Sequence, residues 1–181
     1  MLRSVPFALA LAAAAPAAAF DLSSSDFEPG GELAMEQVAD VFGCTGGNVS
    51  PALSWSDPPE GTKSFALMVH DPDAPTGGAG FWHWIVLDIP ASATGLASGA
   101  GAADGTGLPE GARMIPNDYG AAAWGGPCPP EGDSPHRYNF TLYALEGATS
   151  GIAEGASTAV AGFLVNAAAL GTATLTGMYG H

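Results

Sequence analysis

Residues 63–77, KSFALMVHDPDAPTG, place a strand directly before a rigid turn. Residues 63–71 are apolar at odd and even positions alike, which is typical of a strand in the middle of a sheet that is covered on both faces. Asp71 and Asp73 then share a turn with two prolines, which fix the backbone φ angle and remove amide donors. We therefore predict a buried central strand that ends in a stiff turn carrying two carboxylates.

Two further runs read as strands of the same sheet. Residues 81–90, FWHWIVLDIP, are mostly apolar and stop at a proline, and residues 136–145, HRYNFTLYAL, alternate in polarity. Alternation puts His136 and Tyr138 on one mostly apolar face and Arg137 on the other. The same parity places His83 on one face with Phe81, Ile85 and Leu87.

Glycine and proline punctuate short apolar runs along the whole chain, a pattern that favours an all-β dominated fold in a single domain. Residues 172–180 are predicted to form a closing strand, and residues 91–112 a long surface excursion of small residues. Ser157 is a candidate cap for one helix, with Gly171 as its stop. The predicted buried face of this helix consists of Val160, Phe163, Leu164 and Ala167.

The first nineteen residues have the features of a signal peptide that precedes a domain over residues 20–181. One cation, Arg3, is followed by an apolar run and by the small residues Ala17, Ala18 and Ala19. The apolar run is shorter than the ~20 residues that a membrane-spanning helix needs. We therefore expect export to the periplasm or the medium, without stable membrane insertion.

The charge of the chain excludes one class of partner. Without the leader, three cations (Lys63, Arg113 and Arg137) stand against eighteen acidic residues, a formal charge near −15. Because nucleic acids bind through clustered lysine and arginine, we expect no nucleic-acid partner. The acidic surface itself is typical of a soluble protein.

Two cysteines, Cys44 and Cys128, are present. An even number of cysteines in an exported protein favours a disulfide bond. A cysteine metal or redox site is the alternative, and the absence of a C-x-x-C spacing disfavours it.

Polar residues gather in three stretches at the predicted strand ends: HDPDAPTGG (70–78), FWHW (81–84) and GGPCPPEGDSPHRY (125–138). Together with NVSPALSW (48–55), these stretches resemble the phosphatidylethanolamine-binding protein family in its bacterial Raf-kinase-inhibitor-like branch. The similarity runs in order over residues 42–145. It implies a large central antiparallel sheet, a smaller sheet, peripheral helices and a pocket for phosphate-like anions at one end, with no cofactor.

Carried over by position, the resemblance implies six ligand-binding residues: Asp71, His83, Pro129, Pro130, His136 and Tyr138. Imidazoles can donate N–H groups to phosphate oxygens, and a carboxylate can orient one of them. We expect Phe81, Trp82 and Trp84 to form apolar pocket walls. We expect Arg137, on the opposite face, to pair with Asp73 and brace the pocket, and His70 to be structural.

Three functions compete. The preferred interpretation is a non-catalytic binding protein for a small anionic or phosphorylated ligand, such as a lipid head group. The resemblance also implies an alternative, an inhibitor of a protease or kinase that acts through surface loops. A metal-dependent enzyme using Asp71, His83 and His136 is the less favoured alternative. The tryptophans near the pocket are equally compatible with a ligand wall and with a homodimer interface.

Overall fold

The computed structural model describes residues 19–148 and 150–181, so the predicted signal peptide lies outside the described residues except for Ala19. A five-stranded antiparallel sheet has the order β6 (Arg113–Met114), β4 (Phe81–Pro90), β3 (Ser64–Asp71), β7 (His136–Leu145) and β8 (Ala169–Tyr179). A smaller antiparallel sheet contains β1 (Asp21–Ser23), β2 (Leu53–Ser56) and β5 (Gly95–Leu96). The described residues form one helix, α1 (Thr158–Ala168), so the predicted all-β dominated class is confirmed.

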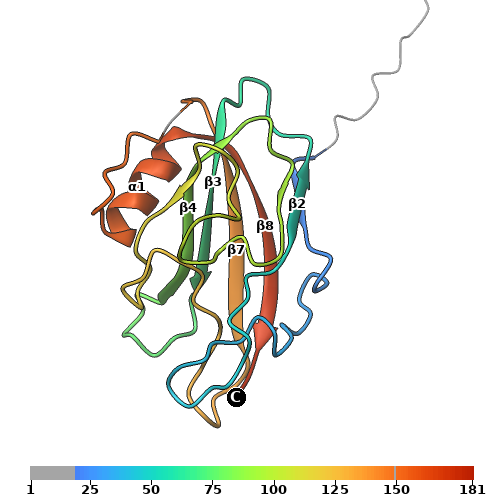
Figure 1. Ribbon diagram of the computed structural model, residues 1–181, viewed down its shortest axis with the longest axis vertical. Helices are drawn as coiled ribbons and strands as arrows, with labels where there is room; N and C mark the ends of the chain where they lie inside the picture. Colours follow the sequence, from blue (N-terminus) through green and yellow to red (C-terminus); the bar gives the residue numbers. More distant parts are fainter. Residues whose placement is uncertain (1–18, 149) are drawn as a thin grey trace, which may run out of the picture.

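The large sheet lies between two apolar cores. Figure 1 shows α1 on one side of this sheet and β2 on the other. Phe65, Leu67 and Val69 of β3 point into the core shared with the small sheet, whereas Ala66 and Met68 point into the core under α1. All five side chains are buried. The uninterrupted apolar run of β3 therefore reflects a central strand covered on both faces, as predicted.

A bulge in β4 changes the direction of one functional side chain. Trp84 pairs with Val69 and Trp82 pairs with His70, so His83 is an extra residue on β4. A bulge of this kind re-aims side chains and breaks the two-residue alternation. The prediction that His83 shares a face with Ile85 and Leu87 is therefore wrong, because these two residues pack in the core under α1.

Helix α1 begins at the predicted cap but buries a different face. Ser157 Oγ accepts a hydrogen bond from the backbone N–H of Val160. The buried side chains are Ala161 and Val165, while Phe163 remains 73% exposed. Val160, Leu164 and Ala167 are also exposed, so the predicted buried stripe is wrong throughout. The apolar residues extend around more than one side of the helix, and the small side chain of Ala161 permits a close approach to the sheet.

Two other boundaries differ from the predictions. The helix ends before Ala169, whose extended backbone starts β8, and Gly171 pairs with Ala144 inside the sheet instead of stopping the helix. Residues 91–112 are not only a surface excursion, since Leu96 of β5 and Ala100 are buried in the core. Among the described residues, no helix combines the length and the apolar character needed to cross a membrane.

The structure contains a disulfide bond between Cys44 and Cys128, the two cysteines expected to pair. The two cysteines are 84 residues apart in the sequence. The bond ties residues 125–130, which precede β7, to the segment around Phe42. Both segments border the cavity described below.

Candidate functional site

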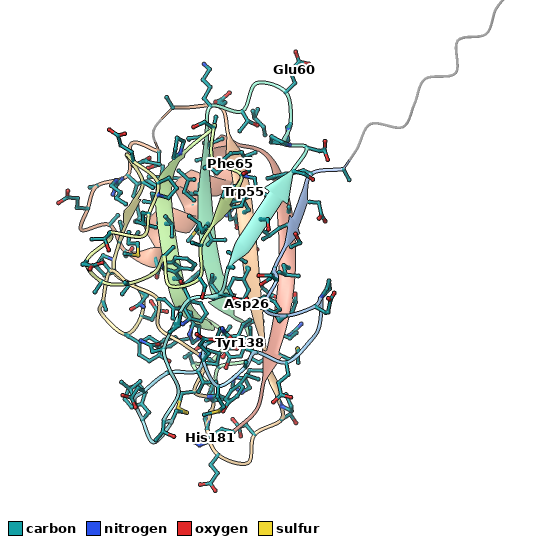
Figure 2. All side chains as sticks on the ribbon, turned by 45° about the vertical axis from the view of Figure 1, so that its right-hand side comes forward. Asp26, Trp55, Glu60, Phe65, Tyr138 and His181 are labelled. Atoms are coloured by element: carbon teal, nitrogen blue, oxygen red, sulfur yellow. A yellow bond between two sulfur atoms is a disulfide. The ribbon has the colours of Figure 1, made fainter. Side chains whose placement is uncertain are left out.

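A small cavity of about 170 Å³ lies at one end of the large sheet. Figure 2 shows Tyr138 in this half of the molecule, above His181 near the C-terminus. The structure brings the six residues implied by the resemblance to this one cavity: Asp71, His83, Pro129, Pro130, His136 and Tyr138. Phe81, expected as a wall, also lines it.

Antiparallel pairing explains why these distant residues meet. Strand β3 ends at Asp71, opposite Phe81 at the start of β4. Strand β7 starts at His136 on the other side of β3, with Asn139 opposite His70. The end of β3 and the beginnings of β4 and β7 therefore lie together at one end of the sheet. The proline-rich segment before β7 covers this end and closes the cavity.

Asp71 holds His136 in a fixed orientation. Asp71 Oδ1 accepts hydrogen bonds from the backbone N–H groups of Asp73 (2.8 Å) and Ala74 (3.0 Å). Its Oδ2 accepts the Nδ1–H of His136 at 2.8 Å. Both side chains are buried. Since Nδ1 carries a proton in this arrangement, the other ring nitrogen, Nε2, is the atom of His136 available for further contacts; it lies 3.7 Å from Asp133 Oδ2.

His83 is held by a backbone carbonyl instead of a carboxylate. Its Nδ1 donates to the oxygen of Gly125 at 2.7 Å, because a carbonyl oxygen can only accept. Burial lowers the pKa of His83 to about 4, although the Gly125 carbonyl and the charge of Asp71 act in the opposite direction. The ring is therefore neutral near pH 7. Its buried Nε2 has no hydrogen-bond partner in the described part of the chain.

The hydroxyl of Tyr138 is the second unpaired polar group of the cavity. Tyr138 is fully buried, and its oxygen has no hydrogen-bond partner among residues 19–148 and 150–181. Burial, together with the negative charge of Asp71, raises the pKa of this hydroxyl, so it stays protonated at all physiological pH values. Its ring packs edge-on against His83, with centroids 5.1 Å apart.

Two aromatic residues of the cavity were not predicted. Tyr119 lines it, and its hydroxyl donates to the oxygen of Gly126 at 3.0 Å. Phe42 stacks on Tyr119 with ring centroids 6.0 Å apart and remains 81% exposed at the cavity. Both lie in irregular segments, where no periodic pattern indicates the direction of a side chain.

Neither predicted tryptophan wall belongs to the cavity. Trp84 is fully buried in the core beside Met114 and Trp124. Trp82 lies against His70 with ring centroids 4.3 Å apart and packs on the core under α1. Because of the bulge at His83 and the alternation of side chains along β4, these two tryptophans point away from the cavity.

Arg137 lies outside the cavity and binds Asp73. Its Nε and Nη2 donate to the two carboxylate oxygens at 2.9 Å and 2.6 Å, and its backbone N–H donates at 2.9 Å. The hydrogen bond from Arg137 lowers the pKa of Asp73 to about 2. This pair fastens the turn after β3 to the start of β7. No lysine or arginine of the described residues lines the cavity itself.

The residues of the metal-enzyme alternative are not arranged as a metal site. In the described ranges, the group of at least three His, Cys, Asp or Glu residues whose ligand atoms all lie within 4.8 Å of one another consists of Cys44, Cys128 and His181. The two sulfur atoms of this group are bonded to each other, so they are not free ligands. Asp71, His83 and His136 do not form such a group. The metal-dependent alternative is therefore not supported.

Comparison with known proteins gives matches over most of the chain. The family model described as phosphatidylethanolamine-binding protein matches residues 23–180. The UPF0098 protein YbcL of Escherichia coli is 49% identical over 165 residues, which cover 91% of this chain and 90% of YbcL. Its crystal structure, described as a member of the mammalian PEBP family, has a TM-score of 0.87 at 48% identity and covers 91% of this chain and 99% of that chain.

Two more distant relatives extend this result. The UPF0098 protein YbhB of Escherichia coli is 40% identical over 158 residues, which cover 87% of this chain and 98% of YbhB. A protein of Mycobacterium tuberculosis described as the putative lipoprotein LppC is 39% identical over 179 residues, which cover 97% of this chain and 81% of LppC.

Proposed function

Because this chain belongs to the phosphatidylethanolamine-binding protein family, we propose that it is a non-catalytic binding protein whose cavity holds a phosphate-like anion or a phospholipid head group. The observation that carries the proposal is the pair of buried, unpaired polar atoms at the cavity, His83 Nε2 and the Tyr138 hydroxyl. Leaving a buried polar atom without a hydrogen bond costs about 1–3 kcal/mol, so such atoms are rare unless they serve a ligand.

The remaining groups of the cavity suit the same ligand. Asp71 accepts the Nδ1–H of His136, which leaves His136 Nε2 for a polar contact with the ligand. Phe81, Pro129 and Pro130 supply apolar walls, which lower the local dielectric and strengthen each polar contact. A cavity of about 170 Å³ accommodates a small oxyanion or head group, with any longer part of the ligand outside.

Export is part of the proposal. The leader-like residues 1–19 motivate it, and the lipoprotein description of the Mycobacterium tuberculosis relative indicates an envelope location for that protein. The inhibitor alternative would act through surface loops such as residues 91–112, which are mostly exposed although Leu96 and Ala100 are buried. The unpaired polar atoms of the cavity favour the binding function over this alternative.

Calorimetric titration with inorganic phosphate tests the binding site. We expect His83→Ala and His136→Ala to weaken binding at least about tenfold, because each removes one polar contact from a dry site. Lys63→Met is the control: it removes an exposed cation just before the start of β3, at the opposite end of the strand from Asp71 and outside the cavity, so it should leave the affinity nearly unchanged. Unaltered binding in both histidine variants, or loss of binding in Lys63→Met alone, would rule out this cavity.

A further inference from the structure

The protonation state of His83 restricts which anion the cavity accepts. Nδ1 of His83 donates to Gly125, so a neutral ring presents a lone pair at Nε2. The charged groups that act on the pKa of this ring are the carboxylates of Asp71 and Asp118, and both favour its protonation. Burial outweighs them and keeps the ring neutral. The phenol groups of Tyr119 and Tyr138, whose pKa values are raised by burial, remain uncharged.

The cavity therefore offers an acceptor and a donor close together. His83 Nε2 accepts, and the Tyr138 hydroxyl donates, from rings that are in edge-on contact. A fully deprotonated oxyanion would place its own lone pairs against the lone pair of His83. An oxyanion with one remaining O–H group would instead donate to His83 Nε2 and accept from Tyr138 with a neighbouring oxygen.

We infer that the cavity selects an oxyanion that still carries an acidic proton, such as hydrogen phosphate or a protonated phosphate monoester. This inference rests on the proposed function and specifies its ligand. His83 determines the preference for a protonated oxyanion. An ordinary anion site has a cation at such a position, whereas the neutral ring of His83 presents a hydrogen-bond acceptor. The shared ligand chemistry is a phosphate O–H group, whether it comes from a free phosphate ester or from a lipid monoester.

Four probes separate charge from the presence of a proton. Inorganic phosphate keeps an O–H group as monoanion and as dianion, whereas dimethyl phosphate and sulfate have none. Methyl phosphate has one O–H group below a second pKa of about 6 and none above it. We expect dimethyl phosphate and sulfate to bind at least about tenfold more weakly than inorganic phosphate. We expect the affinity for methyl phosphate to fall about tenfold for each pH unit above about 6.

Inorganic phosphate measured over the same pH range is the internal control, because every protein group titrates identically with both ligands. Equal affinities for sulfate, dimethyl phosphate and inorganic phosphate would overturn the inference and leave the proposed function intact. If no probe binds at any pH, the proposed function itself fails. A methyl phosphate profile that parallels the inorganic phosphate profile would also overturn the inference.

The variant His83→Gln supplies a second, independent test. The same holds for His83→Leu, which removes the lone pair and adds no other acceptor, whereas the glutamine amide retains an acceptor oxygen; the preference for inorganic phosphate over sulfate should shrink about tenfold in His83→Leu and less in His83→Gln. An unchanged preference in the folded His83→Leu variant would contradict the role of His83.

Flotation with phosphatidylcholine vesicles, with and without phosphatidic acid, identifies whether the phosphate O–H group belongs to a lipid or to a soluble ester. If the protein floats only with the vesicles that contain phosphatidic acid, the ligand is a lipid monoester. If it binds soluble methyl phosphate but floats with neither kind of vesicle, the ligand is a free ester.

Discussion

Replacing Tyr138 by phenylalanine should make the protein more stable and less able to bind. The hydroxyl is fully buried and has no protein partner in the described residues. A buried hydroxyl without a hydrogen bond costs roughly 1–3 kcal/mol, and its removal leaves a gap of one oxygen atom in a site that is already hollow. We expect the free energy of unfolding to rise by about 1 kcal/mol, which corresponds to an increase in Tm of about 2–4 °C for a domain of this size.

Tyr119→Phe is the matched control in the same cavity. Its hydroxyl donates to the oxygen of Gly126 at 3.0 Å, so the substitution loses a hydrogen bond and should destabilise the protein by about 1 kcal/mol. Urea unfolding followed by tryptophan fluorescence measures both changes, and calorimetry with inorganic phosphate should show about tenfold weaker binding for Tyr138→Phe. If Tyr138→Phe destabilises the protein as much as Tyr119→Phe does, the Tyr138 hydroxyl is not unpaired, and the argument for the cavity fails.

Three further predictions concern stability. Reducing the disulfide, which spans 84 residues, should lower the free energy of unfolding by roughly 4 kcal/mol in the chain-entropy model, and phosphate affinity should fall because the bond supports the cavity wall. Arg137→Met should flatten the pH dependence of stability between about pH 4 and pH 2. The pKa of Asp73 is lowered to about 2 in the folded state, so its pair stabilises the fold above pH 4 and is lost on acidification. The loss should be small in acid titrations, because the pair is largely exposed to solvent. In thermal unfolding, Val165→Ala should cost roughly 2 kcal/mol, whereas Phe163→Ala should change stability by less than about 0.5 kcal/mol.

The sequence could predict those features that depend on strand order and on side-chain alternation in regular strands. The apolar run of residues 63–71 predicts the central strand β3, and the alternation of residues 136–145 places Arg137 outside the cavity and Tyr138 inside it. Alternation failed at His83, because a bulge depends on how two strands fit together and leaves no local sequence pattern. The apolar pattern also gave the wrong buried face for α1. Apolar residues occur on more than one side of this helix, and its tertiary contacts bury Ala161 and leave Phe163 exposed.

The charge of the chain explains why specificity should depend on a proton. With a formal charge of −14, the protein repels anions at long range, and screening by salt limits this effect to about 10 Å. A cavity without lysine or arginine among its described residues cannot offset that repulsion with a fixed positive charge. Binding must then come from short-range hydrogen bonds in an apolar enclosure, where an unpaired lone pair is costly. A ligand that brings its own proton satisfies His83 and also carries one negative charge fewer, so both the local and the long-range terms favour the protonated form.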